Sequence, residues 1–274
     1  MTDIETGTDH LQARVEGRVA VLAFNRPEAR NALSSEMYDG FARALPAIAA
    51  SKDIGCLMVT GNGGAFCAGG DVKNQAQRAS SGGNAAANAE ARVDDLRLRQ
   101  NQVSRALHEL PVPVLGAIPG PAAGAGLSIA LACDLRIMAD STFLTTAFAR
   151  VGFSGDFGGS WFLTQLVGTA TARDLYFTSR RVPAPEALEL GLANRLAPAD
   201  GFEDAAMAYA TEVAAGPPIA HRYMKENLNR ALHHDLGECL DAEAVAMTRT
   251  GQTNDHAEAA RAFVEKRDPT FTGS

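Results

Sequence analysis

The sequence predicts an α/β protein in which helices cover a largely parallel sheet and a helical region follows. Strand-like and helix-like segments alternate through the first two thirds of the 274 residues. Several strand-like runs are apolar throughout and bounded by glycine, which is typical of strands buried on both faces. From residue 201 the periodicity is helical. We therefore expect residues 1–200 to form the core and residues 201–274 a C-terminal helical region.

The first elements are two short strands, a helix and a third strand. The segment LQARVEGRVAVLAFNRP predicts two strands around a turn at Glu16–Gly17. The segment LSSEMYDGFARALPAIAA has Leu33 and Met37 at helical spacing, and Pro46 predicts a kink or a break in that helix. GCLMVTG predicts a buried parallel strand. Residues 78–91 are of low complexity, and we expect them to be mobile.

The middle of the chain is uncharged from Leu110 to Cys133, about the length of a membrane span. Four prolines and then GAG interrupt it, and these would break a single continuous helix. We therefore predict a helix over 93–110, the strand VPVLGAI, a glycine turn, the helix LSIALA and the strand LRIMA. Further on, PAPEALELGLANRLAP predicts a short helix near Pro185 and a short strand. The helical last third is interrupted at GPP (216–218).

The composition excludes several classes of protein. The formal net charge of −7 argues against a nucleic-acid-binding protein, because these are usually basic. The four cysteines form no CxxC pair, and the six histidines show no HxxxH or HExxH spacing, so we expect reduced thiols and no metal site. The first ten residues are acidic and polar, unlike a signal peptide. We expect a cytoplasmic protein with neither a membrane segment nor a nucleic-acid partner.

Two glycine-rich turns each join a predicted strand to a predicted helix, TGNGGAFCAGGDVK (60–73) and IPGPAAGAGLS (118–128). Neither ends in the Gly-Lys-Ser/Thr of a phosphate-binding loop. The second matches only two glycines, Gly124 and Gly126, of a GxGxxG fingerprint. Unpaired N–H groups at two facing turns could form an oxyanion hole. The turns could equally be tight packing corners.

Further blocks of sequence make the chain resemble the crotonase superfamily, the enoyl-CoA hydratases and isomerases, over residues 11–271. The blocks, in family order, are FNRPEARNALSSEM (24–37), GAFCAGGDVK (64–73), PGPAAGAGLSIALACDLRIMAD (119–140), VPAPEALELGLANRLAP (182–198) and AFVEKRDPTF (262–271). The resemblance implies a spiral of ββα units with a C-terminal helical region that assembles trimers or dimers of trimers. It also implies an acyl-CoA thioester as substrate and no cofactor beyond the coenzyme A of that substrate.

The resemblance implies the site residues as well. The thioester oxygen would lie between the backbone N–H groups of Ala68 and Ala125, which would stabilise an enolate. Lys266 or Arg267 could reach the phosphates from the end of a chain, and Asp71 could instead be only a helix cap. The residues implied to line the bound acyl-CoA are Arg26, Ala29, Phe66, Gly69, Gly70, Asp71, Val72, Gly124, Ser128 and Phe148.

The sequence departs from the hydratase pattern at both catalytic glutamates. The first falls on Ser128 and the second near Phe148, and neither side chain can activate water and deliver a proton. The loop VGFSGDFGG instead resembles the VGLxPDxGG loop of isomerase-type members, in which Asp156 matches their aspartate. An apolar pocket would raise its pKa and strengthen it as a base. Asp156 could otherwise only cap the helix that follows.

Three functions remain open. In the leading one, an isomerase, Asp156 moves a proton along an enoyl-CoA or rearranges a ring-containing acyl-CoA such as an epoxidised phenylacetyl-CoA. The second is a hydratase that uses Asp156 and a water held by Ser128, Thr145 or Thr146. The third is a catalytically silent homologue that only binds acyl-CoA.

Overall fold

The computed structural model describes residues 2–71 and 89–274. Val72 and most of the low-complexity segment, 78–88, lie outside the described residues, so the mobility of that segment stays a prediction. The last three residues of that segment, 89–91, begin helix α3 (Ala89–Gln100).

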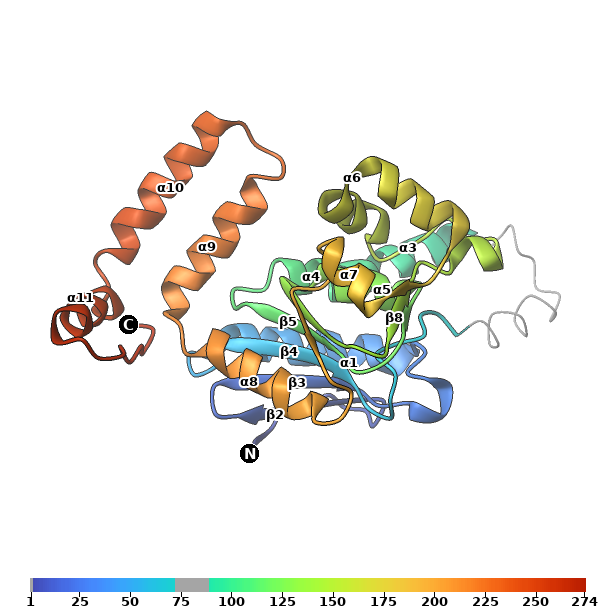
Figure 1. Cartoon of the computed structure of the whole chain (residues 1–274), viewed down its shortest axis with the longest axis horizontal. Coiled ribbons are helices and arrows are strands. Elements are labelled where there is room, and N and C mark those ends of the chain that lie inside the picture. The colour runs from blue at the N-terminus through green and yellow to red at the C-terminus, as the bar shows by residue number, and fades with distance from the viewer. Residues whose placement is uncertain (1, 72–88) are drawn as a thin grey trace.

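A seven-stranded sheet forms the centre of the molecule (Figure 1), in the order β1-β2-β3-β4-β5-β7-β10. Strands β1, β2 and β3 pair antiparallel, whereas β3, β4, β5, β7 and β10 are all parallel. This confirms the α/β class and the largely parallel sheet. The strands are β1 (Thr2–Asp3), β2 (Leu11–Glu16), β3 (Val19–Phe24), β4 (Cys56–Gly61), β5 (Val114–Ile118), β7 (Leu135–Ala139) and β10 (Arg195–Ala197).

A smaller sheet of three short strands lies where the glycine turns are. It has the order β6-β8-β9, with β6 (Ala122–Ala123) parallel to β8 (Phe143–Thr145) and β8 antiparallel to β9 (Val182–Pro183). The segment predicted as one helix over 93–110 is helical as far as His108. Its middle, η2 (Asn101–Arg105), is a π-helical turn followed by α4 (Ala106–His108). The uncharged segment is a strand, a turn and helix α5 (Ala125–Ala132), as predicted.

The parallel strands are buried on both faces, which explains their uninterrupted apolar sequences. Ala20, Leu22 and Phe24 of β3 point into one core, which helices α1 (Ser35–Ala50), α5 and α6 (Gly159–Thr178) cover. Val19 and Val21 point to the opposite face, where α8 (Phe202–Ala214) packs. Helix α8 belongs to the segment expected to form the C-terminal region, yet Figure 1 shows it lying across the sheet.

Helix α1 continues through Pro46, so the predicted break does not occur. Ser34 caps its start, because its hydroxyl accepts a hydrogen bond from the Met37 N–H at 3.3 Å. Pro46 lies on the exposed side, while Leu45 and Ile48 are buried in the core. Burial of these flanking side chains maintains the helix across the hydrogen bond that proline cannot form.

The last three helices extend away from the sheet as a separate helical layer (Figure 1). They are α9 (Pro218–Arg230), α10 (Leu236–Thr250) and α11 (Asn254–Glu265), and they follow α7 (Ala184–Glu189) and α8 in the chain. Lys225 attaches α9 to the core, because its Nζ lies 2.7 Å from Asp134 Oδ2 and donates to the carbonyls of Leu107 and Val112. This confirms the predicted helical character after residue 201.

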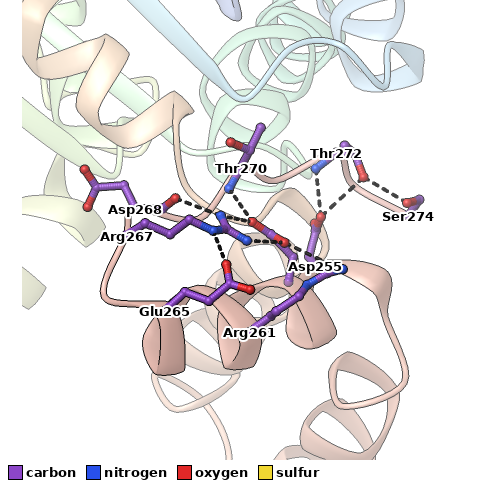
Figure 2. Close-up of polar contacts among 9 residues, drawn as sticks. Asp255, Arg261, Glu265, Arg267, Asp268, Thr270, Thr272 and Ser274 are labelled. Carbon is purple, nitrogen blue, oxygen red and sulfur yellow. Dashed lines mark hydrogen bonds and ion pairs between the residues drawn. The ribbon is translucent and has the colours of Figure 1, made fainter.

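The C-terminal tail folds back onto α11 through a dense polar network (Figure 2). Arg267 pairs with Glu258 at 2.6 Å and with Glu265 at 2.6 Å. The buried Asp255 accepts hydrogen bonds from the N–H groups of Thr272 and Gly273 at 2.7 and 3.0 Å. These contacts fix the tail so that the end of α11 has a defined position. No helix in the described part of the chain is long and apolar enough to cross a membrane.

Candidate active site

The two glycine turns meet at the edge of the parallel sheet. Cys67 and Ala122 form a parallel bridge, in which the Ala123 N–H donates to the Cys67 carbonyl at 2.9 Å. A methyl group added at Gly69 would lie 2.7 Å from the Ala123 carbonyl oxygen and 3.2 Å from the Ala125 nitrogen. The Gly69 φ of +87° also favours glycine. Glycine at this position therefore allows the backbones of the two turns to approach each other.

Ala125 is the first residue of α5, and its N–H is one of those that a helix leaves unpaired. The first bond of the helical turn runs from the Ser128 N–H to the Gly124 carbonyl at 3.0 Å. Within residues 2–71 and 89–274, the N–H of Ala125 has no acceptor. The structure therefore leaves this predicted donor available.

The Ala68 N–H is not available, so its prediction as a donor is wrong. It donates to the Arg30 carbonyl at 3.0 Å. That bond ties the first glycine turn to the segment after β3, and the sequence of the turn gives no sign of it. An amide with an internal partner has no free proton for a ligand oxygen.

The N–H of Gly70 is available instead. Leu33 and Gly70 form a parallel bridge in which the Leu33 N–H donates to the Gly69 carbonyl at 2.8 Å. In such a bridge the N–H of the paired residue points away from the neighbouring segment. No acceptor in the described ranges takes this proton. Gly70 and Ala125 thus supply one free donor from each turn.

Asp156 lies in the loop before α6 and does not cap that helix. The helix begins at Gly159, its cap residue is Gly158, and no side chain bonds its first turn. Asp156 Oδ1 is buried and has no hydrogen-bond partner among the described residues. Burial raises the pKa of this carboxyl from 3.8 to about 6. The alternative in which Asp156 serves only as a cap is therefore wrong.

Three side chains near Asp156 respond to its charge: Tyr38, Cys67 and Tyr176. Burial is the largest cause of the raised pKa of each, to about 12, and the negative charge of Asp156 raises all three further. Cys67 belongs to the first glycine turn, so the carboxylate lies near that turn. Among residues 2–71 and 89–274, no cation lowers the pKa of Asp156.

The loop that carries Asp156 is held in place by its neighbour Phe157. Phe157 has a φ of +51°, which is unfavourable for a side chain of this size. Its N–H donates to Gln100 Oε1 at 2.8 Å, and its buried ring stacks on Tyr38 with centroids 5.8 Å apart. Packing against α1 and α3 thus compensates for the backbone strain and orients the loop.

The residues at the positions of the hydratase glutamates are buried packing residues. Ser128 is 1% exposed, and its hydroxyl donates to the Gly124 carbonyl at 3.3 Å. Phe148 is 7% exposed and stacks on Tyr176 with centroids 5.9 Å apart. The hydroxyl groups of Thr145 and Thr146 already donate to carbonyls, at 3.1 and 2.8 Å.

The residues predicted along the bound acyl-CoA have different surroundings. Phe66 is fully buried and packs edge-on against Phe24 at 5.4 Å, so the prediction that it contacts a ligand is wrong. Arg26 donates to the Ala32 carbonyl at 2.8 Å and lies 3.6 Å from Asp71, linking the start of the site to its first turn. Ala29 is partly exposed.

The chain end offers one free cation of the two that were predicted. Arg267 is occupied by Glu258 and Glu265. Lys266 has no ion-pair partner within the described residues, and it follows the exposed Phe263 and Val264 at the end of α11. Of the two, Lys266 is therefore free to bind a phosphate.

A cavity of about 360 Å³ opens beside the loop of Asp156. Phe157 and Gly158, the two residues after the carboxylate, form part of its wall. The rest of the lining combines four aromatic rings with four polar side chains: His108, Trp161, Phe162 and His233, and Gln100, Asn101, Ser104 and Arg105. Tyr176, Tyr38 and Gln100 are functional neighbours that sequence reasoning missed. Only the position of Tyr38, three residues before Phe41 and seven before Leu45 on the predicted helix, gave any sign of burial.

The chain matches the family model for enoyl-CoA hydratase/isomerase over residues 14–274. It belongs to the enoyl-CoA hydratase/isomerase family. Known members resemble it over nearly their whole length. The 1,2-epoxyphenylacetyl-CoA isomerase of Escherichia coli is 32% identical over 269 residues, covering 97% of this chain and 99% of that protein. The short-chain-enoyl-CoA hydratase of Clostridium acetobutylicum is 31% identical over 253 residues, covering 92% and 93%.

Solved structures of the enoyl-CoA hydratase/isomerase family confirm the fold. The crystal structure of an enoyl-CoA hydratase from Polaromonas sp. JS666 superimposes with a TM-score of 0.88 at 31% identity, covering 95% of this chain and 99% of that one. The predicted crotonase-like fold is therefore correct. The relatives include both hydratases and an isomerase, so family membership alone does not choose between the two reactions.

Proposed function

We propose that this enzyme is an acyl-CoA isomerase in which Asp156 transfers a proton along the acyl chain. The observation that supports this is a partly buried carboxylate that does not cap the following helix and whose Oδ1 has no partner in the described part of the protein. A native protein rarely retains such a group without a function. A pKa of about 6 leaves Asp156 ionised at neutral pH and makes it a stronger base than an ordinary aspartate.

The N–H groups of Gly70 and Ala125 would bind the thioester oxygen. Removing a proton beside the carbonyl places negative charge on that oxygen, and fixed donors stabilise the charge where it develops. Neither amide has an acceptor among the residues that the structure describes, and both belong to turns whose backbones are in close contact at Gly69. They replace the pair that the sequence suggested, Ala68 and Ala125.

The proton shift needs only one carboxylate. Asp156 would take a proton from C2 of a 3-enoyl-CoA, and the electrons of that C–H bond would delocalise onto the thioester oxygen and C4. The same carboxyl would then return the proton to C4, which gives the 2-enoyl-CoA. Substrate and product have the same composition, so no cofactor is consumed.

The aromatic cavity would hold the far end of the acyl group. It begins at Phe157 and Gly158, directly after the base, and its lining is mainly apolar. Arg26, Ala29 and Asp71 lie at the first turn, on the side where coenzyme A would extend. A ring-containing acyl group would suit the aromatic wall, and a relative of matching length is named for a phenylacetyl derivative.

Hydration is the second candidate, because a relative that covers nearly the same length is named as a hydratase. The site offers it less support. Ser128 and Phe148 occupy the positions of the two glutamates, and the hydroxyls of Ser128, Thr145 and Thr146 already donate to carbonyls. A water molecule would depend on Asp156 alone for activation.

Assays with cis-3-enoyl-CoA and trans-2-enoyl-CoA test the proposal. Migration of the double bond without addition of water is the expected result, and it should disappear in Asp156→Asn. Water addition by the wild type would select the hydratase. Binding of both thioesters without turnover would select the silent homologue.

We further propose that helices α9 to α11 form the interface of a homotrimer or hexamer. These helices expose apolar side chains that a monomer would leave in water: Met224, Leu228, Leu236, Leu240, Met247, Phe263 and Val264. Light scattering of the purified protein tests this proposal, and a monomeric mass would contradict it.

A further inference from the structure

Tyr176, on α6, has a phenol oxygen that the proposed mechanism leaves unused. Its Oη is buried and forms no hydrogen bond of normal geometry with any residue that the structure describes. Leaving a buried hydroxyl unpaired destabilises the folded protein, because the group has lost its hydrogen bonds to water. Buried polar atoms of native proteins therefore nearly always have a partner, which can be a ligand or water.

The phenol points at the loop that carries Asp156. A methyl group added at Gly155 would lie 3.2 Å from Tyr176 Oη, and one at Gly159 would lie 2.8 Å from it. The same methyl group at Gly159 would collide with the hydroxyl of Ser128. The oxygen thus lies against the two glycines on either side of the base, next to the position of a hydratase glutamate.

The aromatic ring is held in this orientation by Phe148. The two rings stack with centroids 5.9 Å apart and an angle of 21° between their planes. The phenylalanine that removes a glutamate from the hydratase pattern therefore supports a tyrosine hydroxyl beside the same place. Sequence alignment detects the loss but not this replacement, because Tyr176 lies 28 residues further along the chain.

Asp156 and Tyr176 provide an unpaired acceptor and an unpaired donor. Asp156 Oδ1 is buried without a partner, and its charge contributes, after burial, to raising the pKa of Tyr176 to about 12. The phenol therefore keeps its proton at neutral pH. The two groups are close enough to interact electrostatically, yet they form no hydrogen bond with each other.

We propose that Tyr176 donates a hydrogen bond to an oxygen atom carried by the acyl group, so that the substrates are acyl-CoA thioesters oxygenated near C3. This inference rests on the proposed function. There, Asp156 would act at C2 and C4, so a donor beside its loop would be best placed to reach an oxygen on the carbon between them. A hydrocarbon chain would leave the phenol unpaired, whereas an oxygen at C3 would satisfy it. A site with such a donor binds an analogue that lacks the oxygen less tightly, because the donor is then left unpaired.

A structural role for Tyr176 is the competing explanation. The hydroxyl of Ser160 lies near enough to lower the pKa of Tyr176, although burial outweighs it. If Ser160 accepted the phenol proton in solution, Tyr176 would only help to hold α6 against the loop. The experiment must therefore measure the interaction between the phenol and the ligand oxygen.

Binding of two thioesters that the enzyme does not convert provides this measurement. Butanoyl-CoA and acetoacetyl-CoA have the same chain length and differ by an oxygen at C3. Their dissociation constants would be measured by calorimetry with the wild type and with Tyr176→Phe. Tyr223→Phe, which changes a tyrosine on α9, is the matched control. Comparing both ligands with both proteins isolates the pairwise term, because general effects of the substitution cancel.

We expect Tyr176→Phe to reduce the preference for acetoacetyl-CoA over butanoyl-CoA by about fivefold to tenfold, the range of a neutral hydrogen bond. Tyr223→Phe should leave the preference unchanged, and thermal unfolding should show that Tyr176→Phe is folded. An unchanged preference in a folded Tyr176→Phe would overturn the inference and leave the proposed function standing. If neither thioester binds to the wild type, the proposed function itself fails.

Discussion

The substitution Asp156→Asn should inactivate the enzyme and at the same time stabilise it. Burial raises the pKa of Asp156 from 3.8 to about 6, and no cation among the described residues opposes this shift. Each pKa unit corresponds to 1.36 kcal/mol, so the ionised carboxylate destabilises the folded protein by about 3 kcal/mol at neutral pH. Asparagine has nearly the same shape and no charge. We therefore expect a gain of about 2–3 kcal/mol, or roughly 5 °C in Tm.

The gain must depend on pH in a defined direction. The folded-state pKa lies above the unfolded value, so the folded protein binds the proton more tightly. Below about pH 3 the carboxyl is protonated in both states and costs nothing, and at pH 4 the cost is still small. The cost grows between about pH 4 and pH 6 and is complete above that. Asp156→Asn should therefore be clearly more stable than the wild type at pH 7 and close to it at pH 4.

Chemical denaturation at the two pH values measures this difference, and Asp53→Asn in an exposed loop is the matched control. The control should change stability by less than about 0.5 kcal/mol at either pH. Turnover of Asp156→Asn should fall by at least about 100-fold, the usual contribution of a general base. Lower stability at pH 7, or an equal gain at both pH values, would refute the argument that a buried charge is retained for catalysis.

Three further perturbations test other parts of the structure. Ala125→Pro removes the free N–H at a helix position that tolerates proline, so kcat should fall about 100- to 1000-fold with little loss of stability. Ala68→Pro instead breaks a hydrogen bond and should lower the midpoint of unfolding. Full activity in Ala125→Pro would contradict the assignment of its N–H to the oxyanion hole. The value of kcat/KM should rise with pH to a plateau, with its half-maximum near pH 6, because Asp156 acts in its ionised form. A half-maximum below pH 5 would exclude Asp156 as the base. Lys225→Met leaves Asp134 without its buried partner and should lower the free energy of unfolding in denaturant by about 3–5 kcal/mol. The control Arg222→Met removes an exposed ion pair with Glu226 and should lower it by less than about 1 kcal/mol.

Local sequence patterns were sufficient for most elements of the fold. VPVLGAI and LRIMA were predicted as buried strands, and β5 and β7 lie within them, because strands covered on both faces need uninterrupted apolar residues. Pro46 was the exception. Its effect on α1 depends on which side of the helix faces the core, and the packing of Leu45 and Ile48 determines that.

The sequence also identified Asp156, since a single acid among aromatic residues and glycines is unusual in any loop. It could not show whether the carboxylate caps a helix, because that depends on where α6 begins. The aspartate, the two glycine turns and the family were thus available from the sequence. The reaction, isomerisation or hydration, was not.

Tertiary structure alone decided which groups of the site are free to act. Whether Ala68 or Gly70 offers its N–H depends on pairing with residues 30–33, more than thirty positions earlier in the chain. The phenol of Tyr176, which has no partner among the described residues, comes from the C-terminal end of α6 and lies against the loop of Asp156. Backbone N–H groups are chemically identical in every residue but proline, so a sequence cannot mark the unpaired ones. Only the folded chain determines which of them have lost their contact with water without gaining an internal partner.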